Sequence, residues 1–165
     1  MRDAHNRALA RELLDLARKG TQMIATAESC TGGLVAGAIT DLPGASEIFD
    51  RGFVTYSNAA KIEMLGVRTA TLDVHGAVSR ETALEMAEGA LKFSRATRAV
   101  SITGIAGPDG GTAEKPVGLV HFACAGPNRA RHVERRFGPL SRDEIRAAAV
   151  AQALEMLIES VQPRP

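Results

Sequence analysis

The sequence predicts an α/β fold, a three-layer α/β/α sandwich around a mixed, mostly parallel sheet. Apolar runs of strand length alternate with helical patterns through the first two thirds of the chain. Two later strands are joined by the residues of a hairpin turn. The 165 residues are 45% hydrophobic and no repeat or linker divides them, so we expect one domain over residues 1–165.

The first elements follow from periodicity and from the residues that end them. Leucines recur at helical spacing over residues 4–19, and Gly20 is expected to end that helix in a left-handed conformation. Residues 23–27 form an apolar run typical of a strand buried on both faces. Residues 34–40 predict a helix that the proline- and glycine-containing turn at 41–44 closes.

The middle of the chain predicts a strand and two helices. Residues 49–56 are expected to form the second strand, and residues 58–65 a short helix that a glycine ends. Residues 67–78 are expected to be mostly loop. Ser79 can cap a helix, and the apolar stripe after it predicts a helix through Phe93.

The last third predicts three strands and a long helix. Residues 99–103 form a strand that a glycine-rich loop follows. Residues 117–125 and 131–137 are expected to form the hairpin, because turn residues separate them. A capping box at 141–144 starts the final helix, which we expect over 143–159.

The final helix bears on the expected assembly. Its apolar stripe is broad enough for more than a core and favours a homodimer, although such stripes more often belong to the core. The stripe consists of Ala147, Val150, Ala151, Leu154, Leu157 and Ile158.

Composition argues against several classes of function. The net charge is +1 without a block of like charge, and aromatic residues make up only 4%, so we expect no nucleic-acid partner. No apolar run approaches the roughly 18 residues of a membrane span, and no signal peptide is recognisable. Cys30 and Cys124 form neither a disulfide framework nor a metal pattern, which favours a reducing cytoplasm. The four histidines lack metal-ligand spacing, so we expect no metal and no other cofactor.

The first candidate site is the turn between the strand at 23–27 and the helix at 34–40. Ser29 stands where a nucleophile would stand, and the new helix offers unpaired N–H groups to a developing negative charge. Cys30 at the same turn is either a nucleophile or a small packing residue. No histidine lies near Ser29 in the sequence, so an activating base must come from elsewhere in the chain.

A second candidate site follows the second strand. Tyr56 ends this strand and Lys61 enters the next helix. Taken singly, such a tyrosine is more often just half-buried, and such a lysine more often just lies on the surface. Their spacing is not the Tyr-x-x-x-Lys of short-chain dehydrogenases, whose residues share one helical face. The nearby glycines lack the G-x-G-x-x-G fingerprint, which argues against a nucleotide-binding oxidoreductase.

The third candidate site is the glycine-rich segment 103–112. Glycines let a backbone approach a ligand closely, and open α/β sheets bind ligands where such strands end. The alternative is a flexible surface loop; a Walker loop is excluded, because no Gly-Lys-Ser/Thr follows. Arg142 and Arg146, one turn apart on the last helix, either bind a phosphate or form a solvated face.

Several motifs in order resemble the CinA C-terminal domain family over residues 8 to 160. They are Thr26–Gly33, Phe49–Asn58, His75–Ser79, Gly104–Pro108 and Gly110–Thr112 with Lys115–Gly118. The resemblance implies a three-layer α/β/α sandwich, in agreement with the elements above. The family includes stand-alone amidases that convert nicotinamide mononucleotide to nicotinate mononucleotide and ammonia in pyridine nucleotide recycling. Larger members add an N-terminal molybdopterin-binding-like domain that has no counterpart here, so the stand-alone amidase is the expected type.

The resemblance also implies roles for individual residues. Ser29 would be the nucleophile and Lys61 the general base, with Tyr56 relaying a proton or orienting the lysine. The nucleotide-binding residues implied are Cys30, Thr31, Gly32, Asn58, Thr103, Gly104 and Gly107. The competing expectation is a non-catalytic nucleotide-binding or interaction domain linked to competence or DNA damage.

Overall fold

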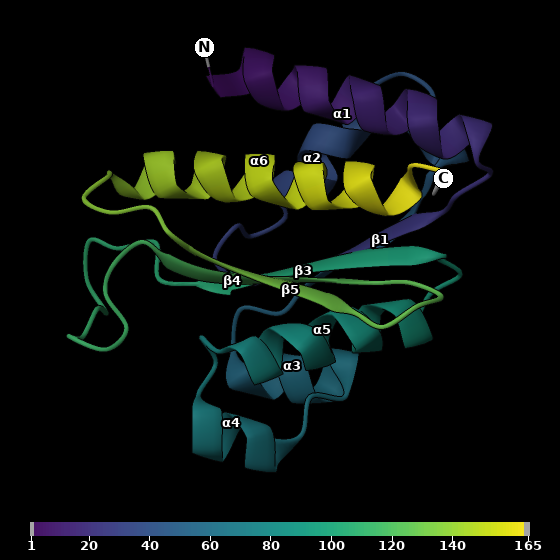
Figure 1. Cartoon of the computed structure of the whole chain (residues 1–165). Coiled ribbons are helices and arrows are strands. Elements are labelled where there is room, and N and C mark those ends of the chain that lie inside the picture. Colours follow the sequence, from purple (N-terminus) through teal and green to yellow (C-terminus); the bar gives the residue numbers. More distant parts are fainter. Residues whose placement is uncertain (1, 164–165) are drawn as a thin grey trace.

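The computed structural model describes residues 2–163, which build a five-stranded sheet between two layers of helices (Figure 1). The strands are β1 (Ile24–Glu28), β2 (Phe49–Val54), β3 (Arg98–Gly104), β4 (Leu119–Ala125) and β5 (Arg131–Arg136). They lie in the order β2-β1-β3-β4-β5. β1 pairs in parallel with β2 and β3, whereas β4 is antiparallel to both of its neighbours. The sheet is therefore mixed but mostly parallel, because β4 alone runs opposite to the other four strands.

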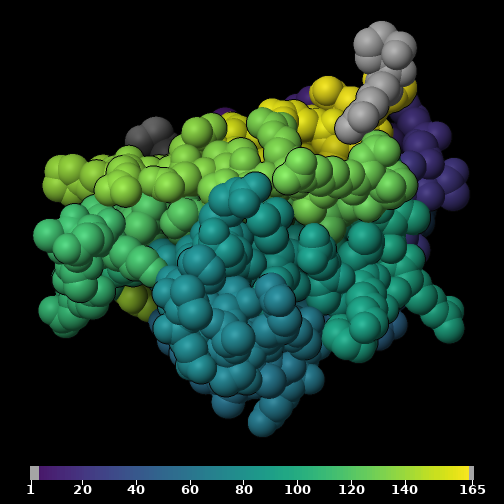
Figure 2. Space-filling model, turned by 60° about the horizontal axis from the view of Figure 1, so that its bottom comes forward, coloured from purple at the N-terminus to yellow at the C-terminus, as the bar shows by residue number. Residues whose placement is uncertain are grey.

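Helices cover both faces of this sheet, which confirms the predicted sandwich. One layer contains α1 (Arg2–Lys19), α2 (Leu34–Thr40) and α6 (Arg142–Val161), and the other contains α3 (Asn58–Leu65), α4 (Thr69–His75) and α5 (Arg80–Lys92). A short 3-10 helix, η1 (Ala45–Glu47), precedes β2. Viewed from the second layer, the helices that follow β2 project as a lobe beside the loop after β3 (Figure 2).

Each helical layer has its own apolar core. The larger core lies under α1, α2 and α6 and includes Leu13, Phe122 and Leu154, all fully buried. The smaller one lies under α3 and α5, which approach closely, because a Cβ at Gly89 would stand 2.0 Å from the carbonyl oxygen of Leu65. A glycine on α5 thus lets the end of α3 pack directly against α5.

The apolar stripe on α6 packs mainly inside this chain. Val150, Leu154, Leu157 and Ile158 are buried in the larger core. This matches the interpretation of the stripe as core, so the homodimer stays a prediction without support from these four residues.

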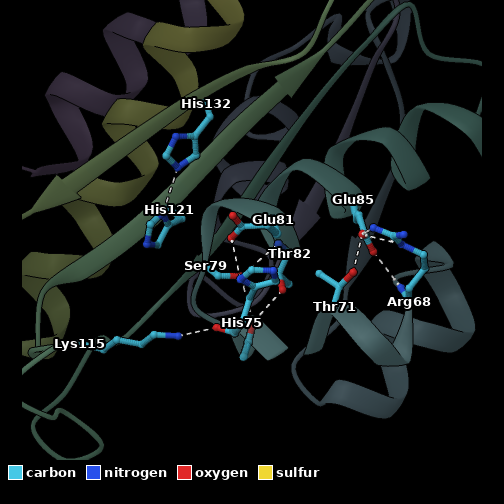
Figure 3. A network of polar contacts seen from close by, with 11 residues as sticks. Arg68, Thr71, His75, Ser79, Glu81, Thr82, Glu85, Lys115, His121 and His132 are labelled. Atoms are coloured by element: carbon cyan, nitrogen blue, oxygen red, sulfur yellow. Dashed lines mark hydrogen bonds and ion pairs between the residues drawn. The ribbon is translucent and has the colours of Figure 1, made fainter. Parts of the chain in front are cut away.

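The prediction of a loop over residues 67–78 was wrong in part, because α4 lies within it. Contacts with α5 hold this helix in place. The carboxylate of Glu85 on α5 accepts hydrogen bonds from the Arg68 side chain and backbone and from the Thr71 hydroxyl (Figure 3). Leu72 adds a buried contact. Seven residues rich in β-branched side chains have weak helix propensity, so tertiary contacts decide their structure.

The end of α1 also differs from the prediction. Thr21, with a φ of 52°, takes the left-handed position that was expected for Gly20. The amide of Gln22 bonds to Ala17 and that of Thr21 to Arg18, which is the hydrogen-bond pattern of a Schellman motif. The glycine therefore lies one residue before the position that favours it.

None of the helices among residues 2–163 combines the length and apolar composition that a membrane crossing needs.

Candidate active site

The carboxyl ends of three parallel strands meet at one edge of the sheet. Ser29 follows β1, Thr55 and Tyr56 follow β2, and Gly104 ends β3. Because β1 lies between the other two, Ser29 stands between the loops that follow β2 and β3. The chain leaves β1 toward β2 on one side, while β3 lies on the other, so Ser29 occupies a topological switch point of the sheet.

Ser29 and Lys61, 32 residues apart in the sequence, are in direct contact. The side-chain nitrogen Nζ of Lys61 lies 3.0 Å from Ser29 Oγ and 2.8 Å from the carbonyl oxygen of Thr55. Lys61 is 1% exposed and Ser29 is 9% exposed. The structure thus brings together the residues expected to be nucleophile and base, in a site nearly closed to water.

The surroundings of Lys61 favour its neutral form. Burial lowers the pKa of Lys61, and only a charged Cys30 would oppose that shift. Ser57 caps α3 by accepting a hydrogen bond from Ala60, which places Lys61 in the first turn of the helix. The positive end of the helix dipole also disfavours an ammonium there. A neutral amine can accept the proton of a serine hydroxyl.

Glu28 shapes the turn that carries Ser29. Its buried carboxylate accepts hydrogen bonds from the backbone N–H groups of Val35 (2.8 Å) and Ala36 (3.0 Å). It thereby ties the end of β1 to the first turn of α2. Gly32 and Gly33, with φ of 59° and 99°, supply the left-handed residues that the tight turn needs. Sequence reasoning missed Glu28; an acidic residue placed before a helix start was the available signal.

Backbone donors of the turn remain open. Ser29 N–H bonds to Ile102 and Gly32 N–H bonds back to Ser29, whereas within residues 2–163 those of Thr31 and Gly33 have no acceptor and that of Cys30 faces only its own sulfur. Such N–H groups beside a nucleophile can stabilise an oxyanion.

Cys30 contributes packing and backbone rather than a reactive sulfur. Its side chain is buried in the larger core, and burial raises the pKa of the thiol to about 11. It is therefore protonated at neutral pH and a poor nucleophile. This supports the packing interpretation of Cys30.

The two arginines of α6 contact the candidate site; Arg142 is exposed whereas Arg146 is half-buried, so the solvated-face interpretation was wrong for Arg146 alone. Arg146 donates to the carbonyl oxygens of Cys30 (3.1 Å) and Thr31 (3.3 Å). Arg142 donates to the carbonyl oxygen of Gly107 (2.8 Å) and to the hydroxyl of Tyr56 (3.0 Å). Tyr56 is thus bonded to Arg142, whereas Lys61 is oriented by Thr55 and Ser29.

The expected nucleotide-binding residues occupy different settings around Ser29. Thr31 is fully buried and its hydroxyl has no partner among the described residues, while Asn58 is exposed at the start of α3. Thr103 uses its hydroxyl to donate to the carbonyl of Ala77 (2.7 Å), which ties β3 to the turn before α5. Gly32, described above, belongs to the nucleophile turn.

The glycines after β3 are required by packing. A Cβ at Gly104 would lie 2.7 Å from Val120, and one at Gly107 would lie 2.5 Å from Val117. The loop bonds back to β4 through Ile105, whose N–H donates to Leu119. These contacts argue against a freely flexible loop, the alternative that the sequence left open.

Within the described part of the chain, no three acidic, histidine or cysteine side chains are grouped so that they could hold a metal ion.

Comparison with known proteins shows what the whole chain is similar to. The model of the CinA C-terminal domain matches residues 6–161. The chain is 57% identical over 134 residues to the nicotinamide-nucleotide amidohydrolase PncC of Escherichia coli K12, covering 81% of each protein. It is 48% identical to a putative competence-damage inducible protein of Caldanaerobacter subterraneus, of which it spans 37%. A competence/damage inducible protein CihA of Agrobacterium tumefaciens has the same fold, with a TM-score of 0.94, 57% identity and 96% coverage of both chains.

Proposed function

Because this chain belongs to the CinA C-terminal domain family, we propose that it is a nicotinamide-nucleotide amidase. It hydrolyses the carboxamide of nicotinamide mononucleotide to nicotinate mononucleotide and ammonia, a step of pyridine nucleotide recycling. The observation that carries the proposal is the 3.0 Å contact between Lys61 Nζ and Ser29 Oγ in a buried site. The proposal assigns the activity to one domain over residues 1–165.

The contact gives each residue a role in amide hydrolysis. Neutral Lys61 takes the proton of Ser29 as the serine oxygen attacks the carboxamide carbon, which forms a tetrahedral oxyanion. Collapse of this intermediate breaks the C–N bond, and the proton held by Lys61 passes to the departing nitrogen to release ammonia. Water then hydrolyses the acyl-serine with Lys61 as base again. No metal or other cofactor enters these steps.

The open backbone donors suit the oxyanion. The N–H groups of Cys30, Thr31 and Gly33 lie within the nucleophile turn, next to Ser29, and Glu28 holds that turn in place. Loss of one donor of this kind usually costs roughly 3–4 kcal/mol in the transition state.

Residues around the turn are proposed to bind the rest of the nucleotide. The unpartnered buried hydroxyl of Thr31 and the backbone of Gly32, which has no side chain to block an approaching ligand, belong to the turn itself. Asn58, Thr103, Gly104 and Gly107 lie on the two flanking segments. Tyr56 is proposed to assist by proton donation, since its oxygen accepts from Arg142 and its O–H remains able to donate.

Assembly and location are proposed with the activity. We propose a homodimer, as the sequence favoured, and a reducing cytoplasm, in which the two free buried cysteines stay reduced. We also propose that no nucleic acid binds, because the net charge is only +1.

The decisive experiment measures ammonia and nicotinate mononucleotide after incubation with nicotinamide mononucleotide. Ser29→Ala should abolish turnover, while Ser94→Ala, a serine in the loop after α5, should retain it. Activity that survives in folded Ser29→Ala would remove Ser29 as nucleophile. A wild type without product would favour the non-catalytic binding role.

A further inference from the structure

Arg142, at the start of α6, joins two loops with one side chain. Its Nη1 donates to the carbonyl oxygen of Gly107 at 2.8 Å, and its Nη2 donates to the Tyr56 hydroxyl at 3.0 Å. A guanidinium is planar and presents its donors in a fixed fork, so the two bonds also fix the relative positions of their acceptors. We call Tyr56, Arg142 and Gly107 the bridge.

The bridge passes over the carboxyl end of β1. Tyr56 follows β2 and Gly107 follows β3, while β1 lies between these strands. Neighbouring strands are about 4.8 Å apart, so the flanking strands are separated by roughly 10 Å. A link between their loops must therefore cross the strand end where Ser29 begins its turn.

The same helix contacts the turn itself. Arg146, one helical turn after Arg142, donates to the carbonyl oxygens of Cys30 and Thr31. Residues four apart lie on one face of a helix. The face of α6 that carries the bridge thus rests on the nucleophile turn, independently of the Tyr56 contact.

We propose that Arg142 is a positioning residue, which holds the Tyr56 ring across the entrance to Ser29 for the incoming nucleotide. The proposal rests on the proposed function. Tyr56 is 62% exposed, and its hydroxyl has no other hydrogen bond within residues 2–163. Without Arg142 the ring would have to be ordered by the substrate at the moment of binding, which weakens binding.

The chain contains its own reporter of this position. Tyr56 is the only tyrosine and tryptophan is absent, so the tyrosine fluorescence comes from Tyr56 alone. Arg142→Ala should lower its fluorescence anisotropy. Arg142→Lys should lower it too, because one ammonium lacks the planar fork. Arg11→Ala, an exposed arginine on α1, is the matched control and should leave the anisotropy unchanged. Unchanged anisotropy in Arg142→Ala would overturn the proposal.

Kinetics separate positioning from direct contact with substrate. Arg142→Ala should raise KM for nicotinamide mononucleotide about three- to tenfold, the cost of ordering one side chain, with a smaller change in kcat. In a Tyr56→Phe background, where the bridge is already broken, Arg142→Ala should have no further effect on KM. Additive effects would mean that Arg142 acts through Gly107 or on the substrate itself rather than through Tyr56, and would overturn the proposal. A wild type without amidase activity would refute the proposed function alone, since the anisotropy test needs no turnover.

Discussion

Lys61 places an amine in the interior, where an apolar side chain of similar length would cost less. Its Nζ bonds to Ser29 and Thr55, yet burial lowers its pKa, so the native state disfavours the proton that the unfolded chain accepts. Between the native pKa and about 10.5, the unfolded state binds more protons, and stability rises with pH. The base is thus retained at the expense of stability near neutral pH.

Lys61→Met tests this trade-off. Turnover should fall by about 10²–10⁴ or more because the general base is lost. The stability gain of the variant over wild type should be larger at pH 7 than at pH 10, since the wild-type penalty disappears toward the unfolded pKa. Urea unfolding at both pH values measures the gain, and Lys19→Met, exposed at the end of α1, is the control. An equal difference at both pH values would contradict the prediction.

Thr21 is a second residue whose conformation costs free energy. A β-branched side chain at a φ of 52° is unfavourable, whereas glycine adopts that conformation freely. Thr21→Gly should therefore stabilise the fold by about 1 kcal/mol. Thermal unfolding checks this, with Gly20→Ala as the companion variant at a residue without a positive φ. A lower midpoint for Thr21→Gly would show that the left-handed residue is not strained.

At the scale of elements, the carboxylate of Glu28 joins the end of β1 to the first turn of α2. Loss of these hydrogen bonds should therefore lower both the stability of the fold and the activity. In Glu28→Gln one carboxylate oxygen becomes an amide NH₂, which cannot accept the hydrogen bond of Val35 or Ala36. We expect a loss of roughly 1.5–3 kcal/mol, the range for hydrogen bonds to charged groups, together with lower kcat. Glu12→Gln, exposed on α1, should change neither. If Glu28→Gln were destabilised but fully active, the hydrogen bonds of Glu28 would stabilise the fold without positioning the nucleophile turn for catalysis.

The elements also show what local sequence can predict. Helices α2 and α3 have their predicted bounds, because caps and glycines mark their ends. α4 escaped prediction, since its stability comes from Glu85 on another helix. In the candidate site, motif resemblance brought out Ser29 and Lys61, whose contact joins α3 to the end of β1. The partner of Tyr56 lies 86 residues away on α6, and no local pattern encodes that pairing.

At the scale of the whole molecule, a histidine pair joins the two strands of the β4–β5 hairpin. His121 Nδ1 and His132 Nε2 are 2.9 Å apart, which allows a hydrogen bond only while one ring is neutral (Figure 3). Burial lowers the pKa of both rings; the charge of His132 and then of Lys115 lowers the pKa of His121 further, and that of Arg80 lowers the pKa of His132. Glu134 and Glu81 oppose these changes in pKa but do not reverse them.

The pair makes global stability depend on mildly acidic pH. Depressed native pKa values mean that the unfolded chain binds more protons, so the stabilisation is complete above about 6.5 and is lost as pH falls through the native values. His132→Gln, whose amide can still bond to His121, should flatten the dependence between pH 7.5 and pH 5, whereas exposed His5→Gln should leave it intact. Urea unfolding across this range measures how the free energy of unfolding depends on pH. An equally steep loss of stability in His132→Gln would assign the acid sensitivity to groups outside the pair. The carboxylates of Asp50 and Glu85, whose pKa values are lowered, release their contribution only as pH falls below about 4.5.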